Sequence, residues 1–139
     1  MNTGNEATRA QSAALQELGL SEHHIAAFLE GRAAVYYLPT ESEPGIAIIQ
    51  KWGARLRSGI VVINDPGGGV KTLLRFRQRS RTVARTFHLA ELELFGAAVI
   101  NDKLESILLN NGFARDRIVC PDELGNDGNI DILAKVFAV

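Results

Sequence analysis

Four arginines stand at every second position near the middle of the chain: Arg75, Arg77, Arg79 and Arg81. On a β-strand, where side chains alternate between two faces, all four would share one face while Leu74 and Phe76 would face a core. The planar guanidinium group matches the geometry of phosphate and carboxylate groups. The spacing therefore predicts an anion-binding face on an arginine-rich strand. The alternative is an exposed sheet face whose charges meet acids elsewhere, such as Glu91 or Glu93.

His88 is the candidate acid–base residue of this region. It follows the arginines directly in the sequence, and a histidine beside arginines suits the cleavage of a phosphodiester. The alternative is an ordinary histidine at the boundary between two elements, because no partner for its ring can be placed from the sequence. His23 and His24 are adjacent, so on a helix they diverge by about 100° and do not form the i, i+4 pair that a metal prefers.

The glycine run between Pro66 and Val70 invites comparison with phosphate-binding loops. A Walker A loop ends in Gly-Lys-Ser/Thr and leads into a helix, but here Val70 separates Gly69 from Lys71 and a strand is expected to follow. No glycine lies three positions after Gly69, so the dinucleotide pattern is absent as well. The run is interpreted as a flexible hairpin loop.

Neither the single cysteine nor the acidic residues near the carboxyl end form a recognisable site. Cys120 lies at the end of an apolar run, where cysteine is usually a small buried side chain. The acids of the following loop lack the order of a calcium-binding loop; they are Asp122, Glu123, Asp127 and Asp131. The sequence therefore predicts no metal and no cofactor.

The composition bounds the class of protein. The chain has 139 residues, of which 46% are hydrophobic and 22% charged, with a net charge of −1. These values predict one globular domain over residues 1–139, with residues 1–5 disordered. The charge is unevenly distributed: residues 66–90 carry six bases and no acid, and residues 91–139 carry nine acids and four bases. The first residues do not resemble a signal peptide and no apolar run is as long as a membrane span, so the expectation is a cytoplasmic protein without a membrane.

Step by step along the chain, the residue pattern predicts an α+β fold. Helices are expected at residues 6–18 and 22–30, which form an N-terminal helical hairpin, at residues 88–100 and from Asp102 to about Asn111. Strands are expected at residues 33–38, 60–63, 117–120 and 130–139, with the arginine row and its return at residues 82–87 completing a mostly antiparallel sheet of five or six strands. Residues 45–56 fit a helix or a strand, with a preference for helix from the cap around Ser42. The helices near residues 89–111 are expected to pack on one face of the sheet.

Two functions of different class remain open at this point. The first is a non-enzymatic interaction module, dimeric through an open sheet edge, that binds an anionic ligand, nucleic acid or an acidic protein through the four arginines. The second is a small phosphodiester-cleaving or phosphate-binding enzyme that uses His88 with neighbouring arginines. The first is preferred, because the sequence shows charge but no matched nucleophile, base or metal set.

Overall fold

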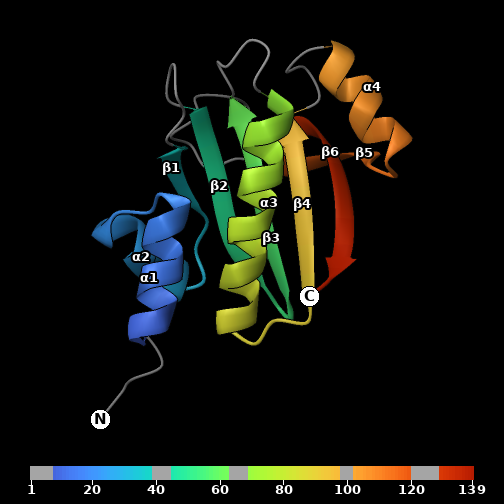
Figure 1. Cartoon of the computed structure of the whole chain (residues 1–139). Helices are drawn as coiled ribbons and strands as arrows, with labels where there is room; N and C mark the ends of the chain where they lie inside the picture. Colours follow the sequence, from blue (N-terminus) through green and yellow to red (C-terminus); the bar gives the residue numbers. More distant parts are fainter. Residues whose placement is uncertain (1–7, 39–44, 63–68, 98–101, 120–128) are drawn as a thin grey trace.

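The fold is a single six-stranded sheet with its first three helices on one face (Figure 1). The computed structural model describes residues 8–38, 45–62, 69–97, 102–119 and 129–139. Its helices are α1 (Arg9–Leu18), α2 (Glu22–Leu29), α3 (Gly69–Thr86) and α4 (Asp102–Asn110). Its strands are β1 (Ala34–Leu38), β2 (Gly45–Trp52), β3 (Arg55–Val62), β4 (Glu91–Ala97), β5 (Ala114–Val119) and β6 (Asn129–Ala138). The predicted α+β class, with its N-terminal helical pair and mostly antiparallel sheet, is confirmed.

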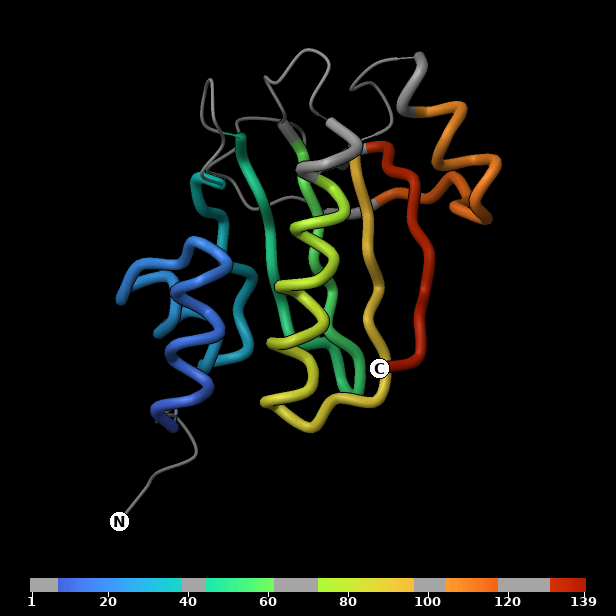
Figure 2. The backbone as a smooth tube through the Cα atoms, in the orientation of Figure 1, coloured from blue at the N-terminus to red at the C-terminus, as the bar shows by residue number. Residues whose placement is uncertain are grey.

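The strands lie in the order β1-β2-β3-β4-β6-β5. The first three form an antiparallel meander, and β6 pairs antiparallel with both β4 and β5. Between them, β3 and β4 run parallel, from Arg55 opposite Glu91 to Ile60 opposite Gly96. Parallel neighbours need a long connection that crosses the sheet, and α3 supplies it, lying along β3 and β4 in Figure 2.

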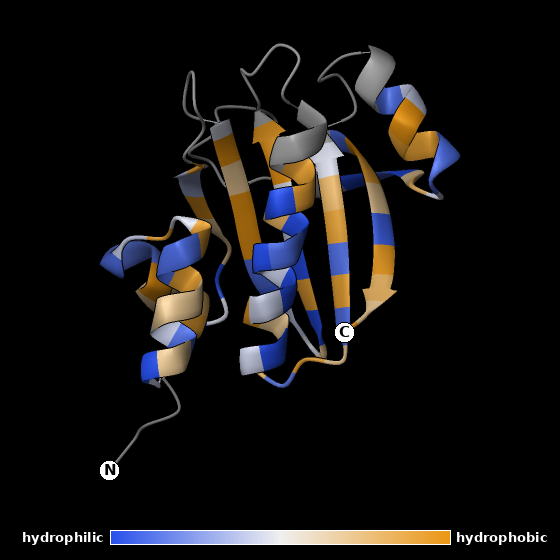
Figure 3. Cartoon of the chain, viewed as in Figure 1, coloured by the Kyte–Doolittle hydropathy of each residue, from blue (hydrophilic) through white to orange (hydrophobic). Residues whose placement is uncertain are grey.

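The predicted N-terminal helical pair forms, but α1 begins at Arg9, later than the expected residue 6, and α2 ends at Leu29. Thr8 caps α1 through a reciprocal pair of hydrogen bonds with Gln11, and Gly19 ends it in the left-handed conformation with φ of 120°. Ser21 precedes α2, as expected. Each helix turns apolar side chains inward, so that Leu15, Leu18 and Phe28 are fully buried, and hydrophilic and hydrophobic residues alternate along its ribbon (Figure 3).

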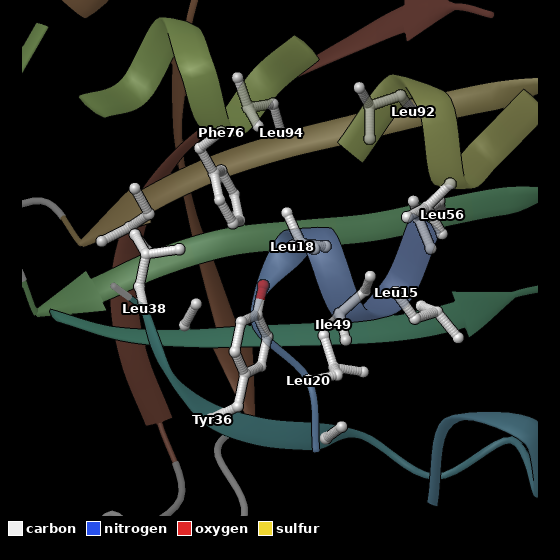
Figure 4. Close-up of a cluster of buried hydrophobic side chains, with 14 of the residues drawn as sticks. Leu15, Leu18, Leu20, Tyr36, Leu38, Ile49, Leu56, Phe76, Leu92 and Leu94 are labelled. Carbon is white, nitrogen blue, oxygen red and sulfur yellow. The ribbon is translucent and has the colours of Figure 1, made fainter. Parts of the chain in front are cut away.

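The main hydrophobic core fills the space between this face of the sheet and the helices. Leu18 of α1, Ile49 of β2 and Phe76 of α3 meet there (Figure 4). Tyr36 lies in the same core, and its hydroxyl has no hydrogen-bond partner among the described residues. Burial raises the pKa of this hydroxyl above its ordinary value, so it stays protonated.

The prediction of an arginine-rich strand is wrong: residues 69–86 form the helix α3, which includes all but the last residue of the return strand expected at 82–87. Its buried residues are Phe76, Ser80, Val83 and Ala84. Their spacing of four, seven and eight positions from Phe76 is that of one helical face. The period-two row of arginines coincides with this pattern and hides it. On a helix, Arg75 and Arg79 lie near one another, and Arg77 and Arg81 lie on a different side.

Two other segments were assigned to the wrong element. Residues 45–52 form the strand β2, and the turn at Gly53, with φ of 63°, leads into β3. Residues 91–97 form β4 instead of a helix, because Leu92 and Leu94 face the core while Glu91 and Glu93 face the other way. A buried strand in the middle of a sheet needs apolar groups on both faces, and Phe95 provides one on the second face. The helix from Asp102 and the final strand agree with the prediction, whereas the strand expected at residues 117–120 begins earlier, at Ala114.

A close contact between Gly59 and Phe95 holds β3 against β4 on the face away from α3. An added Cβ on Gly59 would lie 2.1 Å from the Phe95 ring. Phe95 is 1% exposed and packs with Ile48, Val61 and Ile132. Only glycine leaves room for this ring beside β3.

An ion-pair network joins β3 and β4 at their amino-terminal ends. The Glu93 carboxylate accepts hydrogen bonds from Arg55 Nη1 at 3.0 Å and from Arg57 Nε at 3.1 Å, and Glu91 accepts from Arg55 at 3.2 Å. These hydrogen bonds, first to Glu93 and then to Glu91, raise the pKa of Arg55. Glu93 is 6% exposed. Glu91 and Glu93, the acids expected to meet the arginine row, therefore pair with arginines of β3.

Gly59→Ala should lower the free energy of unfolding by about 1–3 kcal/mol, because the methyl group displaces a packed ring. Phe95→Ala should cost about 3–5 kcal/mol through the cavity that it leaves. The double variant should cost less than the sum, since the ring that clashes is then absent. Urea unfolding monitored by circular dichroism measures all three. A loss of unfolding free energy in the double variant equal to the sum of the two single losses would contradict the contact.

Glu93→Ala should lower the free energy of unfolding by about 2 kcal/mol, because two partly buried guanidinium groups lose their shared carboxylate. The matched control is Glu91→Ala, whose side chain is half exposed and should cost less than about 1 kcal/mol. Equal losses in the two variants, measured by the same urea titration, would show that burial of Glu93 does not strengthen the network.

Candidate functional site

The parallel strands β3 and β4 stop pairing before either strand ends. The last paired residues are Ile60 and Gly96, whereas β3 continues to Val62 and β4 to Ala97. Among the described residues, the β3 backbone past Ile60 thus has no β4 partner. Gly96 contributes no side chain at this point. The arrangement leaves backbone groups of two strands available to an extended ligand between them.

The helix α3 begins at the same edge of the sheet. A crossover between parallel strands leaves the carboxyl end of the first strand and enters the second at its amino end. The N-terminus of α3 therefore lies at the edge where β3 and β4 end, as Figure 1 shows. The first turn of a helix presents free N–H groups and a partial positive charge, which favour phosphate and other anions. The sequence before Gly69 is rich in glycine.

A groove runs along the flank of α3 toward α4 and β6. It is a cavity of about 230 Å³ with an apolar lining and three polar residues, Arg77, Asn111 and Lys135; the apolar residues are Leu73, Leu74, Leu94, Ile107, Leu108, Phe113 and Phe137. A smaller cavity of about 100 Å³ shares Arg77 and Phe137 and adds Arg81, Leu92 and Ala138. An apolar cavity with a few polar groups is the usual form of a ligand site.

Two cations lie over the Phe137 ring in this groove. The Arg77 guanidinium carbon is 4.3 Å from the ring centroid and Lys135 Nζ is 5.1 Å from it. Lys135 also donates a hydrogen bond to the Asn111 carbonyl oxygen at 2.8 Å. Within the described residues, no acidic side chain forms an ion pair with Arg77 or Arg81. The groove can therefore accept an anionic group beside an apolar body.

The four predicted anion-binding arginines are split by the helix. Arg77 lines both the groove and the smaller cavity and Arg81 lines the smaller cavity, whereas Arg75 and Arg79 line neither. Their role in binding anions stays a prediction. The sequence interpretation missed Lys135, Phe137 and the opening between β3 and β4. One signal could have indicated them: an apolar strand, a glycine run, a helical pattern through Phe76 and Val83, and another strand make up a strand–helix–strand unit.

His88 lies at the other end of α3. It follows the helix with φ of 56°, and the Leu89 N–H donates to the Ala84 carbonyl oxygen in the manner of a helix C-terminal cap. Its side chain is exposed, and in the described part of the chain no hydrogen bond or ion pair reaches its ring. The structure therefore gives His88 a capping position and brings no arginine–histidine–acid set together.

The remaining candidates give no site in the described chain. His23 and His24 contact each other with ring centroids 3.9 Å apart and share the Ser21 hydroxyl. No cluster of metal-ligating side chains occurs among the described residues. Cys120, Asp122, Glu123 and Asp127 lie outside them, as does the turn expected at Asn126. None of the described helices combines the length and hydrophobicity needed to cross a bilayer.

No family model matches this chain, and no curated protein sequence matches it. Several solved structures are similar in fold. An IAA acetyltransferase from Bacillus cereus is 15% identical, with 97% of this chain and 95% of that chain covered and a TM-score of 0.46. A paia N-acetyltransferase from Thermoplasma acidophilum, in complex with coenzyme A, is 12% identical over 83% and 68% of the two chains, with a TM-score of 0.47. A ribosomal-protein-alanine N-acetyltransferase from Brucella melitensis is 16% identical over 96% and 97%, with a TM-score of 0.44.

Both functions expected from the sequence are corrected. The interaction module depended on four arginines along a strand, and the phosphodiester-cleaving enzyme depended on His88 beside that strand. The arginines lie on a helix and His88 caps the far end of it.

His88→Gly should raise the free energy of unfolding by about 0.5–1 kcal/mol, because glycine adopts the left-handed conformation without the cost that a Cβ imposes. His88→Ala is the control and should give no such gain, since alanine retains the Cβ. Thermal unfolding of the two variants measures the difference. A gain from both variants would assign the effect to loss of the imidazole and not to backbone geometry.

Proposed function

We propose that this chain is an acyltransferase that binds an acyl-coenzyme A where β3 and β4 stop pairing and transfers the acyl group to an amine. The observation that carries the proposal is the end of the β3–β4 pairing at Ile60 and Gly96 beneath the N-terminus of α3. It puts free strand backbone next to a helix terminus that favours phosphate. An acyl-coenzyme A has both matching parts, a pyrophosphate and an extended arm with two amide groups.

The groups available around this opening fit such a cofactor. The first turn of α3 would hold the pyrophosphate through its free N–H groups. The unpaired backbone of β3 and β4 would hydrogen-bond the amides of the arm, as an added strand would. Arg77 and Arg81 would neutralise anionic groups along the groove. The described residues supply a cradle without requiring a metal ligand set.

The transfer requires little chemistry from the protein's own side chains. The cofactor supplies a thioester, an activated acyl group that an amine can attack directly to form an amide and release a thiol. The chain would have to bind and orient the acyl group, and a backbone N–H past the last β3–β4 pair would donate a hydrogen bond to its carbonyl oxygen as negative charge develops there. The apolar groove beside it, with Leu94 buried at its base, excludes water from the reacting group.

Acetyl-coenzyme A should bind to the purified chain in isothermal titration calorimetry, with an affinity that falls as salt is raised. Arg77→Ala/Arg81→Ala should weaken binding at least tenfold, because these two arginines line the groove and the smaller cavity that adjoins it. Arg75→Ala/Arg79→Ala is the matched control: it removes the same charge from the same helix, away from the groove, and should change the affinity less than threefold.

Release of free thiol in the presence of a panel of primary amines tests the transfer itself. Absence of acetyl-coenzyme A binding by the unaltered chain would contradict the proposal. Equal losses of affinity in the two double variants would show that the groove beside α3 takes no part in binding.

A further inference from the structure

A second groove lies at the opposite edge of the sheet, along β1. It is a cavity of about 470 Å³ between β1 and α2; its lining residues are His23, His24 and Ala27 of α2, the chain from Arg32 to Tyr37, and Ile46 of β2. In Figure 1, α2 lies at the outer edge of the sheet beside β1. The groove is therefore bounded by an edge strand and overhung by a helix. It shares no residue with the groove beside α3.

The edge of β1 is open for pairing. All five of its residues pair with β2, from Ala34 opposite Ile49 to Leu38 opposite Gly45. On its other side β1 has no strand partner among the described residues, since it ends the sheet. Its residues are AVYYL, with none of the lysine, proline or bulge that usually protects an edge strand. Tyr37 is 71% exposed.

The size of the groove suits an extended peptide. A strand rises about 3.3 Å per residue, lies about 4.8 Å from its neighbour and packs about 10 Å from the next layer, so each residue of an added strand fills roughly 160 Å³. The cavity beside β1 has room for about three such residues. Main-chain hydrogen bonds to β1 would supply affinity, and the side chains under α2 would supply selectivity.

The charges around the groove define the peptide further. Its ionisable lining groups are basic or phenolic: two histidines, Arg32 and two tyrosines. Arg32 forms an exposed ion pair with Glu30, which is not part of the lining, through its Nε and Nη2 groups. A guanidinium group has five N–H donors, so Arg32 retains donors for a second carboxylate. With no carboxylate in the lining, an acidic side chain of the added strand meets complementary groups under α2. A second copy of β1, whose residues are AVYYL, has no acid to offer.

We infer that the β1 edge is a docking groove for an extended acidic peptide segment, which joins the sheet as a seventh strand beneath α2. This site is independent of the proposed acyltransferase activity. It gives the chain a means of holding a polypeptide partner at the edge farthest from β6 and β5.

The test uses three capped hexapeptides and nuclear magnetic resonance of the isotope-labelled full chain. One peptide alternates valine with glutamate, a second alternates valine with lysine, and a third repeats the first with both central amides N-methylated. The first should shift the backbone amide signals of residues 32–38. The second and third should bind at least tenfold more weakly, because they lose the charge match and the main-chain donors respectively.

Variants of α2 locate the site. Ala27→Trp fills the groove and should weaken binding of the valine–glutamate peptide at least tenfold. Ala26→Trp is the matched control, since Ala26 is exposed on the same helix and outside the groove, and it should bind within twofold of the unaltered chain. Thermal unfolding verifies that both variants fold.

Three results would overturn the inference: no binding of any peptide, binding that Ala27→Trp leaves intact, or equal binding of the lysine peptide. Sedimentation of the chain alone is the remaining measurement. A dimer that Ala27→Trp dissociates would assign the groove to a second copy in place of a peptide partner.

Discussion

Parallel strands cannot be joined by a tight turn, so the chain must cross the sheet between β3 and β4, and α3 is that crossing. The rest of the structure follows from this requirement. The helix needs an apolar face toward the sheet, which Phe76 and Val83 provide. The two strands need a close fit at one end and charge pairing at the other, which the Gly59–Phe95 contact and the Glu93 network provide. The helix N-terminus then lies where the strands end.

The proposed cofactor site lies where the parallel pairing of β3 and β4 ends. In a sheet that is otherwise antiparallel, β3 and β4 are the parallel pair among the described strands, and beyond Ile60 and Gly96 they no longer pair with each other. A helix terminus, an opening between strands and an apolar groove with two cations converge on one side of α3. Each alone is common in proteins. Their combination is what favours a long, partly apolar cofactor with phosphate groups.

The two edges of the sheet have different character. At the β1 edge, an uncharged strand lies open beside a helix that overhangs it. At the other edge, β5 carries exposed charges, with Arg117 paired to Asp131 and Arg115 to Glu105. Charged side chains of this kind discourage further strands from pairing, whereas an apolar edge does not. The asymmetry directs an added strand to β1 and leaves the α3 side free for a small molecule.

Local signals in the sequence predicted the helical hairpin, the helix from Asp102, the final strand and the α+β class. These elements depend on capping and periodicity within one segment. The arginine region was different, because RFRQRSR satisfies a period of two while Phe76, Ser80 and Val83 satisfy a helical period, and no neighbouring residue decides between them. The tertiary structure decides: β3 and β4 run parallel and need a helix between them. The groove residues Arg77, Lys135 and Phe137 come from segments far apart in the chain, so only the packing of α3 against β6 brings them together.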